Sequence, residues 1–225
     1  MAQAEGRAAQ AGGSPGLRFP GVAGTLGSMT AAAPRPGPSF PGVAQDVLQA
    51  YLDAPDNVVA EILDGELSLS PRPRPRHAQT TARIARVLGG FHDPDEGEPG
   101  GWIMMIEPEL HLGPRPDIID PDLAGWRRER LPEEPEGAAI DVAPDWACEI
   151  LSARTEARDR GPKRRIYRRE GVGFLWLCDP RIQTLEVYRL EGKRWTELDT
   201  FEGNVKVRAE PFEAVELDLG RIWRW

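Results

Sequence analysis

Lysine is scarce in this 225-residue sequence, where only Lys163, Lys193 and Lys206 stand among 28 basic residues. Histidine occurs three times and cysteine twice, at Cys148 and Cys178, without the clustering that a four-ligand structural zinc site requires. Both cysteines lie in apolar runs, which is typical of small core residues in a protein of the reducing cytoplasm. Because arginine is used almost everywhere else, a lysine at a chemically useful place becomes a functional candidate.

Long apolar runs are also missing. No stretch approaches the roughly 20 apolar residues that a membrane span needs. The N-terminus lacks a basic start followed by an apolar run, so we expect no secretory signal and a cytoplasmic location. Hydrophobic residues make up 40% of the sequence and charged residues 28%, which is ordinary for a globular protein. The length suits one sizeable domain.

Positive charge is in deficit overall, since the formal net charge is −8. This balance is unexpected for a nucleic-acid-binding protein, whose phosphate contacts need arginine and lysine. The charge is uneven, however, because segment 154–169 holds eight basic residues against two acids. We expect a local phosphate-binding face there, with Arg160 and Arg164 as DNA phosphate contacts, and no extended nonspecific coat.

Apolar periodicity divides the chain into two parts. Residues 1–41 are rich in alanine, glycine and proline and predict a disordered tail, while residues 42–225 predict one folded domain. An Asp64-Gly65 pair between two alternating runs predicts a β-hairpin. The expected helices cover 44–52, 78–91 and 163–170, the last with Pro162 in its first turn. The expected strands cover 58–63, 66–70, 102–106, 109–112, 115–119, 145–151, 174–178, 185–190, 195–201, 204–208 and 215–217.

This order of elements predicts a mixed α/β (α+β) chain with a central strand–helix–strand unit. Residues 120–143 are charged and rich in proline, so we expect weak order there.

Two acids stand in apolar strand-like contexts, Asp117 in Pro-Asp-Ile-Ile and Glu149 in Trp-Ala-Cys-Glu-Ile-Leu. A buried carboxylate is costly unless a metal, a base or several donors accompany it. Two carboxylates suffice for Mg²⁺, which keeps several waters, and such a site can hydrolyse a phosphodiester. We expect the two acids on neighbouring strands. The alternative is a pair of ordinary surface acids on a strand that faces solvent.

The sequence resembles the "putative restriction endonuclease" family of bacterial PD-(D/E)XK-type nucleases over about residues 44–225. Four blocks carry the resemblance: Glu61 to Glu66 with Ser70, Pro71 and His77; Arg115-Pro116-Asp117; Glu149 to Ser152; and Asp159 with Lys163, Tyr167, Gly171, Val172, Leu175, Trp176, Asp179 and Pro180. The resemblance implies a restriction-endonuclease-like central mixed β-sheet flanked by helices, with additional β-hairpins. It also implies DNA as substrate and Mg²⁺, or Mn²⁺ in its place, at Asp117 and Glu149, with Glu61 or Glu66 assisting.

One departure from the PD-(D/E)XK pattern is visible. Its lysine falls two residues after the second acid, where this chain has Leu151. The resemblance places the catalytic lysine on the following helix instead, at Lys163. Tyr167 lies four residues further along and shares its face. His77 is a candidate general base, and its alternative is a solvent-facing residue at a helix start.

Three functions compete at this point. The first is a Mg²⁺-dependent DNA endonuclease, for which a homodimer is one way to cut both strands. The second is a catalytically inactive protein of the same fold that binds nucleic acid or another partner, which the Leu151 position and the net charge favour. The third, a metal hydrolase of small phosphate compounds, is weakened by the lack of a glycine-rich phosphate loop.

Overall fold

A computed structural model describes residues 40, 42–94 and 96–225. The predicted tail, residues 1–41, lies outside this range except for Phe40, which packs against His111 at 5.0 Å between ring centroids. No helix of the described ranges is long and apolar enough to cross a membrane.

The strands form three sheets. A six-stranded sheet has the order β11-β10-β9-β8-β6-β3, and a five-stranded sheet has the order β2-β1-β5-β4-β7. The six-stranded sheet comprises β3 (Trp102–Ile106), β6 (Leu123–Arg127), β8 (Trp146–Ile150), β9 (Phe174–Asp179), β10 (Thr184–Glu191) and β11 (Arg194–Glu202). The five-stranded sheet comprises β1 (Val58–Leu63), β2 (Glu66–Pro71), β4 (Glu109–Leu112), β5 (Asp117–Ile119) and β7 (Ala139–Ile140). A small pair is β12 (Lys206–Val207) with β13 (Leu217–Asp218).

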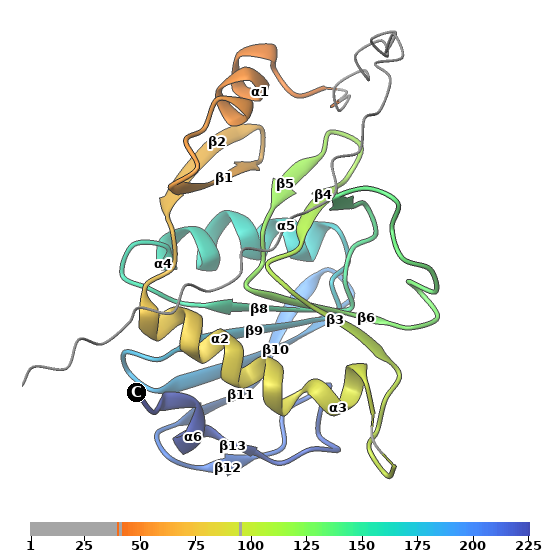
Figure 1. The fold of residues 1–225 in the computed structure, drawn as a ribbon, viewed down its shortest axis with the longest axis vertical. Helices are drawn as coiled ribbons and strands as arrows, with labels where there is room; N and C mark the ends of the chain where they lie inside the picture. The colour runs from red at the N-terminus through yellow and green to blue at the C-terminus, as the bar shows by residue number, and fades with distance from the viewer. Residues whose placement is uncertain (1–39, 41, 95) are drawn as a thin grey trace, which may run out of the picture. The chain divides into compact units, whose positions relative to one another are not determined.

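Strand β8 lies at the centre of the six-stranded sheet, parallel to β9 and antiparallel to β6. All five of its residues are buried, as the nearly continuous apolar run predicts. The chain between β8 and β9 is helical, so the expected strand–helix–strand unit is confirmed. Figure 1 shows this helix and α2 on opposite sides of the sheet.

The helices are α1 (Gln45–Leu52), α2 (Pro75–Val87), α3 (Gly89–His92), α4 (Glu156–Arg158), the π-helical turn η1 (Asp159–Lys163), α5 (Arg164–Arg169) and α6 (Leu219–Trp223). Helix α2 begins three residues before the predicted start, because Pro75 occupies its first position, where a missing N–H is not needed.

The predicted helix start at Lys163 is wrong. Helical structure already begins at Glu156, and Pro162 lies inside the π-helical turn. Proline lacks the N–H that an internal helical position donates, and such wide turns occur where a helix accommodates an irregular position. The turn buries both Asp159 and Lys163, which lie four residues apart.

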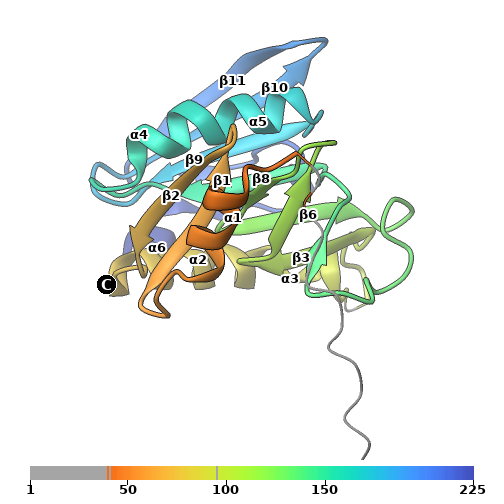
Figure 2. The same cartoon turned by 90° about the horizontal axis from the view of Figure 1, so that it is seen from above.

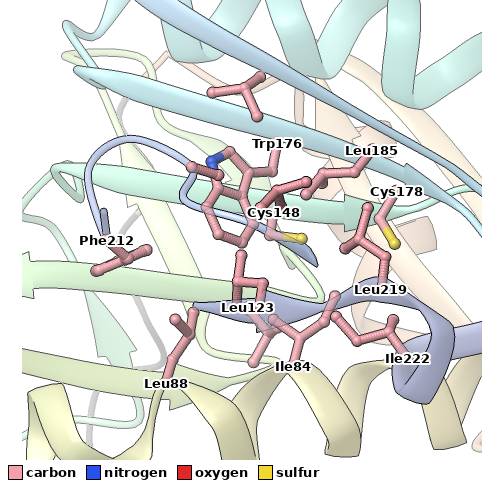
Figure 3. Packing of buried hydrophobic residues seen from close by; sticks show 14 of the residues in the cluster. Ile84, Leu88, Leu123, Cys148, Trp176, Cys178, Leu185, Phe212, Leu219 and Ile222 are labelled. Carbon is pink, nitrogen blue, oxygen red and sulfur yellow. The ribbon is translucent and has the colours of Figure 1, made fainter. Parts of the chain in front are cut away.

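The hydrophobic core on one face of the six-stranded sheet lies between the sheet and helices α2 and α6. Cys148 and Cys178 belong to it together with Ile84, Trp176 and Phe212 (Figure 3). Both thiols are free and buried, and burial raises the pKa of each. The interpretation of the cysteines as core residues is therefore confirmed.

The expectation of weak order over residues 120–143 is wrong in its first part. Residues 123–127 form strand β6, of which four residues are buried, and β6 pairs with β3 and β8. The charged, proline-rich stretch that follows the strand hides this short apolar run in the sequence. This error matters because β6 enters the sheet beside Glu149.

Candidate active site

Glu149 and Lys163 meet at the centre of the site. The Lys163 Nζ atom lies 2.7 Å from the Glu149 Oε1 atom, and the two side chains are 1% and 2% exposed, respectively. Tyr167 donates its hydroxyl to the same Glu149 oxygen at 2.5 Å. Strand β8 supplies the glutamate, and the helix that follows it, η1 with α5, supplies both donors. The structure therefore brings together three residues that the sequence predicts for one site.

Glu61 joins this cluster from the five-stranded sheet. It is fully buried, and its two carboxylate oxygens lie 3.3 Å from Lys163 Nζ and 2.7 Å from the Arg158 guanidinium. Lys163 also donates to the Asp120 carbonyl oxygen at 2.8 Å. Figures 1 and 2 show the β1–β2 hairpin beside the α4–α5 helix that carries these cations. Glu66, the other candidate, is exposed at the hairpin turn.

Asp117 does not lie on a strand next to Glu149, so that expectation is wrong. It begins β5 of the five-stranded sheet, whereas Glu149 belongs to β8 of the other sheet. Its Oδ1 atom accepts from the Asp64 N–H at 2.5 Å, and its Oδ2 atom contacts the Arg169 guanidinium. Asp117 thus ties the hairpin turn to α5 and does not line the pocket described below.

Asp122, which the sequence analysis did not single out, takes the place expected for Asp117. The β6–β8 register pairs Leu123 with Cys148, and its continuation by one residue puts Asp122 opposite Glu149. The Asp122 Oδ2 atom accepts from the Ile150 N–H at 2.6 Å. The available signal was another Pro-Asp pair, Pro121-Asp122, five residues after Pro116-Asp117 and directly before an apolar run.

His77 lies on α2 against Asp122, with its Nε2 atom 3.2 Å from the Asp122 Oδ1 atom. Burial lowers the pKa of His77, but the hydrogen bond and charge of Asp122 outweigh burial, so the net shift is upward. The Nδ1 atom is buried and has no hydrogen-bond partner among the described residues. His77 is thus only partly exposed rather than fully solvent-facing, and it lines the pocket.

A pocket of about 420 Å³ opens above these residues. Its lining includes the acids Asp120, Asp122, Glu149 and Asp159, with Lys163 among them. Arginines of three separate segments complete the wall, and they are Arg72, Arg74, Arg76, Arg154, Arg158 and Arg181. The pocket therefore combines buried carboxylates with a cationic surround, an arrangement suited to a phosphate ester near a cation.

Burial dominates the electrostatics of the acids. It raises the pKa of Glu149 to about 8, although the Lys163 charge acts to lower it. Burial also lowers the pKa of Lys163, but Glu149 and Glu61 outweigh this effect and raise it above its usual value. The pKa of Tyr167 is raised well above its usual value by burial and by Glu149, so its hydroxyl stays protonated and donates.

Asp120 provides the test of whether a cation fits. Burial and Glu61 raise its pKa to about 7, and its Oδ1 atom is buried without a hydrogen-bond partner in the described chain. Across the described ranges, no three His, Cys, Asp or Glu side chains form a ready metal cage. Mg²⁺ does not need one, because it binds one or two carboxylates and keeps several waters. The oxygen donors present therefore fit a hard cation.

Arg160 and Arg164 lie away from the pocket. Arg160 binds both oxygens of Glu186, at 2.8 and 2.5 Å, and also Glu156 at 3.1 Å. The Arg164 guanidinium stacks over the Tyr188 ring, 4.4 Å from its centroid. These contacts engage both side chains, and the structure does not bring them to the site as phosphate contacts.

Comparisons with known proteins agree with this fold. A family model named Uma2 and described as "Putative restriction endonuclease" matches residues 45–220. A solved structure from Anabaena variabilis ATCC 29413, titled a "putative nuclease belonging to DUF820", matches with a TM-score of 0.61 and 22% identity. The match covers 79% of this chain and 97% of that one, and it shows a shared fold. No curated protein matches the chain.

Proposed function

The chain belongs to the family described as "Putative restriction endonuclease", and from this premise we propose that it is a Mg²⁺-dependent endonuclease that hydrolyses DNA phosphodiesters. The observation that carries the proposal is the buried Lys163–Glu149 contact of 2.7 Å. Lysine is rare in this chain. Desolvating a buried ion pair often costs as much free energy as the attraction returns, so this pair is better explained by function than by stability.

Asp122 and Glu149 are the residues that would hold the cation. They lie opposite each other at the end of the β6–β8 ladder, and both line the pocket. When bound, a hard divalent cation neutralises phosphate charge and lowers the pKa of a coordinated water. The Ile150 N–H fixes one Asp122 oxygen, and the Tyr167 hydroxyl fixes one Glu149 oxygen. Such contacts hold carboxylate ligands in one orientation.

Lys163 supplies a positive charge beside the scissile group. Its ammonium is nearly fully buried, so water screens it weakly. It can donate to a phosphate oxygen or hold the attacking water while Glu149 and Glu61 keep it protonated. In this role Lys163 replaces the lysine that the PD-(D/E)XK pattern has two residues after the second acid. Glu61 acts through Lys163 and Arg158, which it positions.

The second candidate is a nuclease-fold protein that binds without cutting. Glu61 and Glu149 already have cationic partners, which favours this candidate. Lys163 contacts both acids, and Arg158 contacts Glu61. These contacts neutralise the buried acids without a metal. Metal-independent DNA binding together with no cleavage would support this candidate.

A plasmid-nicking assay with Mg²⁺ tests the proposal. We expect the wild-type chain to nick supercoiled DNA, EDTA to stop it, and Glu149→Gln to lower the rate by at least about a thousandfold. Glu66→Gln is the matched control, because Glu66 is an exposed glutamate of the neighbouring sheet, and it should nick like wild type. Circular dichroism verifies that the variants fold. A folded wild-type chain that nicks no faster than Glu149→Gln would contradict the proposal.

A further inference from the structure

The pocket wall is unusual in what it offers to a nucleic acid. Six arginines line it, whereas the described residues of its lining include no phenylalanine, tyrosine, tryptophan, asparagine or glutamine, and the imidazole of His77 pairs with Asp122. Aromatic side chains are the platforms on which unpaired bases stack, and asparagine and glutamine are common readers of adenine. Arginine pairs with phosphate through a planar fork of donors. The lining therefore favours the backbone of a strand over its bases.

Four of the six arginines are already engaged. Arg76 donates to the Pro180 carbonyl oxygen, and Arg72 donates to the Asp56 carbonyl oxygen. Arg158 pairs with Glu61 at 2.7 Å. Arg181 pairs with Asp179 and Glu156, both at 2.6 Å. These contacts hold the wall together and fix the direction of four guanidinium groups.

Arg74 and Arg154 differ from these four. Both are exposed at the pocket, and neither has a hydrogen bond or ion pair from its side chain to any residue that the structure describes. They also come from segments far apart in sequence, Arg74 from the β2–α2 connection and Arg154 from the β8–α4 connection. Two free guanidinium groups thus reach the pocket from two independent parts of the fold.

Both segments have a fixed backbone. Prolines at 71, 73 and 75 alternate around Arg74, and each proline ring locks its own φ angle. On the other segment, the Ser152 hydroxyl accepts from the Arg154 and Thr155 N–H groups, both at 3.3 Å. A fixed backbone reduces the entropy lost when a side chain orders on a ligand.

We propose that Arg74 and Arg154 bind the phosphates on either side of the scissile one, so that the pocket holds DNA through its backbone and without regard to sequence. The inference rests on the proposed function for its substrate. It goes further in naming the two binding residues and in placing no sequence readout at this pocket. In a chain with a net charge of −8, these two cations also counter the repulsion between the acidic pocket floor and phosphate.

Fluorescence anisotropy with labelled duplex oligonucleotides tests the inference, in EDTA at pH 7 so that binding is measured without cleavage. Two duplexes of equal length are used, one rich in G·C pairs and one rich in A·T pairs. We expect Arg74→Ala and Arg154→Ala each to weaken binding about tenfold, by the same factor for both duplexes. Each should also reduce the slope of log K against log salt by about one.

Arg86→Ala is the matched control, because Arg86 is an exposed arginine of helix α2 that does not line the pocket. It should leave the affinity within about twofold of wild type. A loss at Arg74 or Arg154 confined to the G·C-rich duplex would overturn the inference, because arginine also reads guanine. Unchanged binding by both variants, or an equal loss in Arg86→Ala, would overturn it as well.

The two proposals fail in different ways. If wild type binds DNA with the expected dependence on Arg74 and Arg154 but Mg²⁺ produces no nicking, the phosphate-binding inference stands and the nuclease proposal falls. If wild type nicks DNA and both arginine variants bind and nick as well as it does, the inference alone falls.

Discussion

Two Pro-Asp pairs of the chain lie five residues apart, Pro116-Asp117 and Pro121-Asp122, and the fold puts them to different uses. Asp117 accepts from the Asp64 N–H and contacts Arg169, so it joins a hairpin turn to helix α5. Asp122 accepts from the Ile150 N–H, contacts His77, and lines the pocket opposite Glu149. The aspartate of one pair connects two structural elements, whereas the aspartate of the other lines the pocket.

The difference comes from sheet membership. Asp117 begins β5 in the five-stranded sheet, while Asp122 directly precedes β6 in the six-stranded sheet that contains Glu149. A carboxylate can share a cation only with groups that the strand pairing brings within reach. The lesson is that the spacing of an acid pair along the sequence does not identify a metal site when two candidate acids flank a change of sheet.

The largest effect expected from this comparison is on cleavage. Asp122→Asn removes a carboxylate charge from the pocket and should lower the Mg²⁺-dependent nicking rate by at least about a thousandfold. Asp117→Asn should keep the rate within about fivefold of wild type, because Asp117 does not line the pocket. Nicking assays of both variants at equal concentration of folded protein measure this contrast. The opposite ranking would return the metal site to Asp117.

The sequence could predict those parts of the site that depend on contacts between neighbouring residues. The β1–β2 hairpin is readable because Asp64 and Gly65 adopt positive φ angles of 53° and 83° in its turn. Strand β8 is readable as an apolar run, and an acid inside it marks Glu149. These signals lie within a few neighbouring residues.

The missed features depend on contacts between distant segments. Asp122 becomes a site residue only because β6 pairs with β8, and no local pattern reveals that pairing. Likewise, Arg160 looks free in a basic segment, but Glu186 on β10 engages it. The scarcity of lysine makes Lys163 a candidate, but only the family resemblance assigns it to the site, because its distance from Glu149 depends on how the chain folds back over the sheet after β8.

A smaller effect is expected in the pH dependence of stability. Burial raises the pKa of Glu149 in the folded protein to about 8 even though Lys163 acts to lower it, whereas the usual pKa of this group, expected in the unfolded chain, is 4.5. The free energy of unfolding should therefore fall as pH rises, until the folded carboxyl has ionised. The slope from one group is at most about 1.4 kcal/mol per pH unit.

Urea unfolding between pH 7 and 8, without divalent ions, measures this slope. In that interval Asp120, with a pKa of about 7, contributes less than it does at lower pH. Lys163 stays charged because its pKa is raised. Glu149→Gln should be flatter than wild type over the interval, and equal slopes in the two proteins would show that Glu149 is already ionised at pH 7.

The smallest expected effect is that of Asp117→Asn on stability. Burial raises the pKa of Asp117 even though the Asp64 N–H and Arg169 act to lower it, so its contacts do not fully offset the cost of burying the charge. Arg169 is about half exposed and keeps Asp64 and Glu170 as partners when Asp117 loses its charge. Asparagine still offers an oxygen to the Asp64 N–H. The free energy of unfolding should thus change by about 1 kcal/mol or less.

Urea unfolding at pH 7 checks this value, with Arg168→Ala as the control, since Arg168 is an exposed arginine of the same helix. The measurement also separates the two ways in which Asp117→Asn could lower cleavage. A rate loss that accompanies a stability loss above about 2 kcal/mol would mean that the tie to α5 holds Lys163 in place. A rate loss at unchanged stability would mean that Asp117 acts on the reaction itself. The two Pro-Asp pairs would then share one function.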